Sequence, residues 1–422
     1  MQVLWGIGGM VFVLLLAVAL SFDRRAINPR TVFGALALQV TFAFIVLYSE
    51  VGQSVLGAVS QGVQAVINSS GEGIAFLFGP VLPEEGSVFA FQVLPVIIFF
   101  ASLTAVLYHW NILQVVVRFV GGGLRRLLGT SRAESMNATA NIFVGQTEAP
   151  LVIRPYISQM TRSEFFAVMV GGLSTAAGSV LVGYSLLGAS LEYLIAASFM
   201  AAPGALLMAK IVMPETETPR DEEPDEANDS DDPGGPDGGS GDDGGSGGSP
   251  RHQNVIDAAA SGAADGLRLA LNVGAMLIAF ISLISLLNLI LGALGGLFGF
   301  EGLTFQLLLG YVFAPVMFAI GVPWSEAIDA GSFLGQKLVL NEFVAFADFG
   351  PQAGNFSEKT QAIVTFALTG FANFGSLAIL LGGLGGIAPE RRPEIARFGV
   401  RAVLAGTLAN LMSATIAGML IF

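Results

Sequence analysis

Long runs of apolar residues constrain this chain more than any other feature of its sequence. The first run, residues 2–22, has about the ~20 residues that a helix needs to cross the apolar core of a bilayer. Similar runs follow, and we expect eight transmembrane helices, at residues 2–22, 31–49, 88–108, 163–188, 190–213, 265–296, 358–384 and 402–421. With 53% hydrophobic and 12% charged residues and a mean hydropathy of +0.71, the chain is too apolar for a soluble protein. The sequence therefore predicts an all-α membrane protein.

Two short polar stretches lie inside this apolar sequence. Asn141-Ile-Phe-Val-Gly-Gln-Thr-Glu-Ala-Pro150 contains the ionisable Glu148, and Leu340-Asn-Glu-Phe-Val-Ala345 contains Glu342. A charged residue at membrane depth costs about 2.5–3.5 kcal/mol on insertion scales, so it usually faces a cavity and marks a site. The segments around these stretches, about 136–160 and 324–350, are too short to cross the membrane twice. We predict that each forms a re-entrant helical hairpin with a polar tip.

Nearly all of the net charge of −13 belongs to one segment. Residues 214–250 hold 13 acidic residues and a single base, Arg220, among many Gly, Ser and Pro. Such a segment buries too little apolar surface to order itself, so residues 214–252 are predicted to be a disordered cytoplasmic linker. A solvated spacer is the simplest interpretation, and a partner-binding tail is the alternative. We expect no binding to nucleic acid.

Basic residues give the orientation of the helices. Arg24, Arg25 and Arg30 follow the first apolar run, whereas a secretory signal peptide has its charge before the run. By the positive-inside rule this cluster is cytoplasmic, which puts both termini outside after eight spans. Lys337 and Lys359 are exceptions to this rule. The arginine-bearing stretch 111–129 is predicted to be an amphipathic helix on the cytoplasmic interface.

The same order of segments occurs twice along the chain. A span, an interfacial segment, a hairpin and two further spans fill residues 88–213 and again residues 253–422. The first copy begins outside and the second begins inside, which is an inverted-topology repeat. Such repeats build alternating access around a midplane site. Residues 1–87 hold the N-terminal transmembrane helices and an outer segment.

The polar residues of the two tips suit a polar organic solute. Carboxylates accept hydrogen bonds from hydroxyls, so Glu148 and Glu342 are suited to a polyol such as ribose. Gln146 and Thr147 are suited to the edge of a heterocycle.

A third group of polar residues lies in the run 358–384. Asn373 and Ser376 are three residues apart and would share a helical face. Phe371 would join them as a stacking surface if the helix were unwound there, which Gly370 and Gly375 permit.

Structural roles would also account for these residues. The two carboxylates would then join neighbouring helices, and the amide and hydroxyl of the later run would satisfy nearby backbone. Phe371 would pack among the 32 phenylalanines of the chain. Thr175 and Ser179 are of a type that often bonds the backbone four residues earlier in membrane helices.

The sequence carries no motif of a soluble enzyme class. It has no cysteine, its two histidines form no ligand motif, and it lacks HExxH, GxSxG and a phosphate-binding loop. An intramembrane enzyme with Glu148 and Glu342 as an acid/base pair is the alternative to transport. A passive channel would not need two matched tips with carboxylates. We therefore predict a transporter and not an enzyme.

Three motifs together resemble the concentrative nucleoside transporter family, and most closely its bacterial sodium-coupled members. They are Asn-Ile-Phe-Val-Gly-Gln-Thr-Glu-Ala-Pro at 141–150, Leu-Asn-Glu-Phe-Val-Ala at 340–345 and Gly-Phe-Ala-Asn-Phe at 370–374. The resemblance extends from about Phe89 to the C-terminus, apart from the acidic linker. It implies a homotrimer in the cell membrane, in which each protomer has eight spans, two hairpins and its own substrate site.

The resemblance also implies residue roles. The nucleobase would be bound by the first tip, the ribose by the second tip and the later run, and sodium by the first tip and span four. The residues implied are Gln146, Thr147 and Glu148 for the base, Glu342, Asn373 and Ser376 for the ribose, Val180 and Phe371 as apolar walls, and Asn141, Val144, Thr175 and Ala176 for Na⁺. The expected activity is sodium-coupled import of nucleosides such as uridine, cytidine and adenosine. Proton coupling is the alternative, and Asn141 favours sodium.

Overall fold

The computed structural model describes residues 2–82, 88–219, 253–300 and 302–421, and every regular element in these ranges is helical. The linker predicted over residues 214–252 lies outside the described residues from position 220 on. The helices, in chain order, are α1 Gln2–Leu20, α2 Pro29–Ala43, η1 Phe44–Tyr48, α3 Glu50–Phe78, η2 Gly79–Val81, α4 Phe89–His109, α5 Ile112–Leu128, α6 Arg132–Ala140, η3 Ala149–Ile153, α7 Arg154–Ile157, α8 Arg162–Ser174, α9 Gly178–Leu186, α10 Leu191–Val212, α11 Val255–Leu297, α12 Phe305–Ala319, α13 Trp324–Val339, α14 Glu342–Phe349, η4 Gly350–Asn355, α15 Glu358–Leu368, α16 Ser376–Gly382, α17 Leu384–Ile387, η5 Pro389–Arg391 and α18 Arg392–Leu420.

Seven helical segments of the described chain are long and apolar enough to cross a membrane. They correspond to seven of the eight predicted runs. The run predicted at 358–384 is the exception, because its helix stops at Leu368 and resumes only at Ser376. Two predicted starts are also too late, since α11 begins at Val255 and α18 at Arg392.

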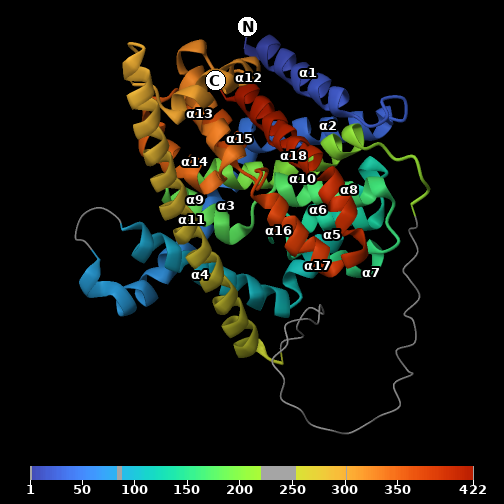
Figure 1. Ribbon diagram of the computed structural model, residues 1–422. Coiled ribbons are helices and arrows are strands. Elements are labelled where there is room, and N and C mark those ends of the chain that lie inside the picture. Colours follow the sequence, from blue (N-terminus) through green and yellow to red (C-terminus); the bar gives the residue numbers. More distant parts are fainter. Residues whose placement is uncertain (1, 83–87, 220–252, 301, 422) are drawn as a thin grey trace.

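The centre of the molecule is a bundle of α8, α10, α15 and α18, which pack against one another (Figure 1). In the spans that contain α8 and α10, 89% of the most apolar 18-residue stretch is buried inside the protein. The corresponding share is 17% in α4 and 11% in α11. α1 packs along α18, and Gly6 near its start lies against Met419, so the two chain ends meet at the same side of the bundle (Figure 1). The central helices therefore meet protein on most sides, while α4 and α11 leave apolar surface uncovered.

α4 and α11 form a separate antiparallel pair beside the bundle. Gly262 lies against Ala101 and Ala105, and Gly266 lies against Ile98, where a Cβ atom would come within 3 Å of the neighbouring helix. Small residues at such contacts let two membrane helices approach closely. With 43 residues α11 is about 65 Å long at 1.5 Å per residue, well beyond the bilayer core.

The two segments predicted as hairpins are helical, with a turn at each polar stretch, and differ in regularity. The first begins at Arg132, four residues earlier than predicted, because Ser131 and Glu134 form a capping box that starts α6 there. After its tip only the short η3 and α7 follow. The second consists of α13 and α14, and Asn341 caps α14 by accepting a hydrogen bond from the Val344 N–H (2.9 Å).

Candidate functional site

The predicted site residues gather where two broken helices meet. The break between α8 and α9 covers residues 175–177, and the break between α15 and α16 covers residues 369–375. The Phe371 N–H donates to the Thr175 carbonyl (N···O 3.1 Å), so the two breaks are hydrogen-bonded to each other. The span predicted at 163–188 is thus present with a break at residues 175–177, and the unwinding considered around Phe371 is confirmed.

Both breaks begin in the same way. Thr175 and Thr369 are the C-caps of α8 and α15, and each hydroxyl donates to the carbonyl four residues earlier, at 2.9 Å to Gly171 and 2.7 Å to Thr365. This satisfies one of the carbonyls that a helix end leaves without a partner. The predicted backbone bond of Thr175 is thus confirmed, and the lone pairs of its oxygen still allow it to bind a cation.

Gly370 allows the second break to approach the first. Its φ is +133°, and a Cβ atom at this position would lie 2.5 Å from the Ser174 carbonyl oxygen and 2.8 Å from Oδ1 of Asn410. Only glycine adopts this backbone angle without strain and leaves that space free.

The tip of the first hairpin docks onto the break between α8 and α9. The Gly178 N–H at the start of α9 donates to the Phe143 carbonyl (3.2 Å). Gln146 packs against Gly172 of α8, where a Cβ would come within 2.8 Å of its side chain. The first tip and span four thus form one unit, as the predicted sodium ligands require.

Buried oxygen atoms without a hydrogen-bond donor collect at this junction. The Nδ2 of Asn141 donates to the Asn137 carbonyl (2.9 Å), but Oδ1 of Asn141, Oδ1 of Asn137 and Oε1 of Gln146 have no partner among the described residues. Val144 and Ala176, the other predicted ligands, are also buried. A buried acceptor without a donor costs about 1–3 kcal/mol, and a hard cation would relieve this cost. These oxygen atoms are therefore suited to bind a monovalent cation that prefers oxygen ligands.

The other two predicted base-binding residues of the first tip are exposed. Thr147 and Glu148 are both accessible, and the Gly145 N–H donates to Oε2 of Glu148 at the long distance of 3.4 Å. Thr147 lies against Gly383, next to the junction of α16 and α17. The first tip therefore faces the junction of α16 and α17 in the second half of the chain. The carboxylate of Glu148 is accessible to a solute.

Glu342 of the second tip is buried and bonded to the second break. Nδ2 of Asn373 donates to Oε2 of Glu342 (2.8 Å), and Oδ1 of Asn373 accepts from the Ser376 N–H (2.8 Å). The Phe374 N–H also donates to the Leu338 carbonyl (3.1 Å), which docks the hairpin onto the break.

The structure brings Glu342, Asn373 and Ser376 together, but for a different reason from the predicted one. Asn373 lies in unwound backbone and α16 begins only at Ser376, so a shared helical face is wrong. The structural interpretation of Asn373 is confirmed by its bond to the Ser376 N–H, and its second bond still holds the carboxylate.

The predicted apolar walls lie on either side of the break contact. Val180 is buried on α9, and Phe371 is half-buried in the second break. One turn after Val180, Tyr184 stacks on Phe346 of the second hairpin with ring centroids 4.4 Å apart. α9 therefore packs on the hairpin of the other half. No hydrogen bond between described residues joins the base set to the ribose set.

Two polar residues of this region were missed by the sequence analysis. Lys337 is fully buried, and its Nζ donates to the Ala367 carbonyl (2.7 Å) and to Oδ1 of Asn410 (2.8 Å). Nδ2 of Asn410 donates to the Ser174 carbonyl (2.7 Å). A buried lysine is no surface charge, so the positive-inside rule does not apply to Lys337. The scarcity of lysine was the sequence signal that pointed to Lys337, because the chain has only three lysines.

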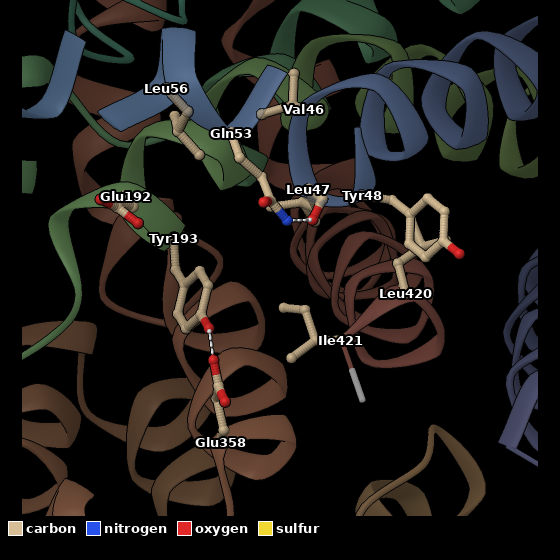
Figure 2. Close-up of a pocket in the computed structure, with 10 residues that line it drawn as sticks. All are labelled: Val46, Leu47, Tyr48, Gln53, Leu56, Glu192, Tyr193, Glu358, Leu420 and Ile421. Atoms are coloured by element: carbon tan, nitrogen blue, oxygen red, sulfur yellow. Dashed lines mark hydrogen bonds between the residues drawn. The ribbon is translucent and has the colours of Figure 1, made fainter. Parts of the chain in front are cut away.

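A cavity of about 450 Å³ lies away from these residues, beside the C-terminal end of α18 (Figure 2). Its lining includes Tyr193, whose hydroxyl donates to Glu358 (3.3 Å), and Gln53, which donates to the Leu47 carbonyl (2.7 Å). Leu420 of this lining is ten residues beyond Asn410, or about 15 Å along the helix. None of the predicted site residues lines this cavity.

Comparison with protein families matches nearly the whole chain. A model described as "Na+ dependent nucleoside transporter C-terminus" matches residues 193–418, and its N-terminal counterpart matches residues 8–81. A model described as "Nucleoside recognition" matches residues 90–191, which include the first tip.

Individual proteins give the same result. The uncharacterised transporter YutK of Bacillus subtilis is 55% identical over the full length of both chains. The nucleoside permease NupC of Helicobacter pylori is 46% identical over 99% of this chain and 98% of its own. The structure of CNTnw in an inward-facing substrate-bound state is 50% identical, covers 100% of this chain and 98% of its own, and superposes with a TM-score of 0.90.

Proposed function

Because this chain belongs to the concentrative nucleoside transporter family, we propose that it imports nucleosides by symport with sodium, through alternating access. Its relatives are permeases and transporters, so it is a membrane transporter and not an enzyme. The observation that carries sodium coupling is the group of buried oxygen atoms without donors beside the break in α8.

The sodium ion would lie between the first tip and that break. Oδ1 of Asn141 and Oγ1 of Thr175 are its side-chain ligands, and the carbonyls of Val144 and Ala176 complete the set. Support comes from the burial of all four residues and from the C-terminal end of α8, whose dipole favours a cation. An ion bound there would hold the first tip against α8.

The nucleoside would lie between the two tips. Gln146, Thr147 and Glu148 would bind the edge of the base, and the apolar walls Val180 and Phe371 would enclose it. For the ribose, Asn373 donates to Oε2 of Glu342, and the remaining lone pairs of that carboxylate could accept from a sugar hydroxyl. The Ser376 hydroxyl makes no hydrogen bond with the described residues and is a second candidate. We expect uridine, cytidine and adenosine among the substrates.

The arrangement of the chain supports alternating access. In both halves a hairpin tip is hydrogen-bonded to the break of the following helix, through Phe143 and Gly178 in one and Leu338 and Phe374 in the other. We infer inverted repeats over 88–213 and 253–422, eight spans and two re-entrant hairpins. The proximity of α1 and α18 supports termini on one and the same side of the membrane (Figure 1). We infer from the basic clusters that this side is the outside and that the linker is cytoplasmic. The uncovered apolar surface of α4 and α11 suits lipid and the proposed homotrimer.

Uptake of radiolabelled uridine into proteoliposomes tests this function. An inward sodium gradient should drive accumulation above the external concentration, and Asn141→Ala should require more sodium for the same rate. Accumulation in sodium-free choline buffer under a pH gradient would assign proton coupling instead. Equilibration without accumulation under either gradient would contradict symport.

A further inference from the structure

Lys337 carries a positive charge into the end of a broken helix. Its ammonium group binds the carbonyl of Ala367, in the last turn of α15, and Oδ1 of Asn410. The last carbonyls of a helix carry about half a negative charge between them, and cations are stabilised near them. In transporters such half-helix ends often coordinate the coupling ion. Lys337 therefore occupies the kind of position that an ion takes elsewhere.

The first half has the same construction without the lysine. α6 packs on α8 as α13 packs on α15, and each of the two broken helices ends in a threonine that bonds the carbonyl four residues earlier. At the end of α6, however, Asn137 and Asn141 present oxygen atoms that no described side chain or backbone group donates to. One half thus has acceptors without a cation, and the other has a cation with acceptors.

Asn410 connects the two sides. Its amide oxygen accepts from Lys337, and its amide nitrogen donates to the Ser174 carbonyl at the end of α8. A shift of the lysine would therefore move the group that bonds the backbone next to Thr175. Asn410 is itself buried.

We propose that the ammonium group of Lys337 is a tethered counterpart of the coupling ion, bound at the end of α15 in the second half. Only the first half then takes an ion from solution. This inference rests on the sodium site proposed above. It assigns to Lys337 a positioning role, through α15 and Asn410, and no contact with the substrate.

Removing the ammonium group should create a need for a second cation. In Lys337→Ala, uridine binding measured by calorimetry on the full-length protein should weaken about tenfold or more, because two buried acceptors lose their donor. Methylammonium, which fits the space left by the side chain, should restore binding, and sodium dependence should become steeper. Lys337→Met fills that space with apolar atoms, so methylammonium should not restore its binding. Tetramethylammonium is the control for ionic strength.

Several outcomes would overturn the proposal. One is Lys337→Ala binding uridine with the parent's affinity and sodium dependence. Another is a folded Lys337→Ala that no cation restores, or a variant that stays unfolded whatever cation is present, because a purely structural side chain would behave in that way. Sodium-independent binding by the parent would contradict the proposed function instead, and the difference between the Ala and Met variants in methylammonium would still decide the role of Lys337.

Discussion

Glu342 should distinguish nucleosides by their ribose hydroxyls. Its Oε2 accepts a hydrogen bond from Asn373 at 2.8 Å, and the carboxylate has further lone pairs that can accept from a sugar hydroxyl. Hydrogen bonds to charged groups contribute about 1.5–3 kcal/mol, and 1.4 kcal/mol changes affinity tenfold. One of the two analogues, 2′-deoxyuridine or 3′-deoxyuridine, lacks the hydroxyl that binds Glu342. Uridine should therefore bind roughly ten- to a hundredfold more tightly than that analogue.

The variant Glu342→Gln should reduce this discrimination. Its amide oxygen can keep the bond from Asn373, which leaves a neutral NH₂ group where the parent has a charged acceptor. The hydroxyl must then accept instead of donating, so the advantage of uridine over the deoxy analogue should shrink to a few-fold.

Calorimetry with uridine and both deoxyuridines on parent and variant measures the effect. Glu358→Gln is a matched control, because that carboxylate also accepts a side-chain hydrogen bond but lines the separate cavity of Figure 2. Its discrimination should equal the parent's. If Glu342→Gln kept the full ribose discrimination and changed the preference among bases, the roles of the two tips would be reversed.

Three further changes have expected outcomes. Asn141→Ala should raise the sodium concentration for half-maximal uridine uptake, and an unchanged value would argue against Asn141 as a ligand. Gly370→Ala should lower the melting temperature and abolish uptake, since the backbone angle alone costs about 1–3 kcal/mol and the added Cβ would lie 2.5 Å from the Ser174 oxygen; Gly382→Ala, where nothing lies within 4 Å, should leave both unchanged. Deletion of residues 218–249 should leave uptake at the parent's rate, because the segment is rich in acidic residues and glycine. Loss of transport in that deletion would indicate a docked role.

The sequence predicted those parts of the fold that local composition determines. An uninterrupted apolar run such as residues 2–22 has only one stable form in a bilayer, so its helix follows from the sequence alone. A carboxylate such as Glu148 within apolar sequence is costly unless it serves a site, and this predicted where the first tip would lie. The capping box at Ser131 was equally local, although the prediction did not use it.

The breaks in α8 and α15 depend on contacts that local sequence does not contain. The partner of the Phe371 N–H is the carbonyl of Thr175, nearly two hundred residues earlier in the chain. Gly370 indicated flexibility, but only the proximity of Ser174 explains why glycine is required there. For the same reason, Asn373 was correctly grouped with Glu342 and Ser376, but on the wrong argument that it shares a helical face with Ser376.

Lys337 and Asn410 could not be assigned to the site from the sequence, because their partners are also far away along the chain. Their bond joins α13 to α18, and the second bond of Asn410 reaches back to α8. A helix that stops leaves carbonyl oxygens without intrahelical donors, and two such ends meet in this protein. A fixed ammonium group compensates one end, whereas beside the other the side-chain oxygens of Asn137, Asn141 and Gln146 have no donor among the described residues. The second tip is bonded to its break through Asn373 and Glu342 and through the backbone of Phe374 and Leu338. The first tip lacks such a bond to its break beyond the backbone contact of Gly178, so an ion at this junction would stabilise the half that faces the base.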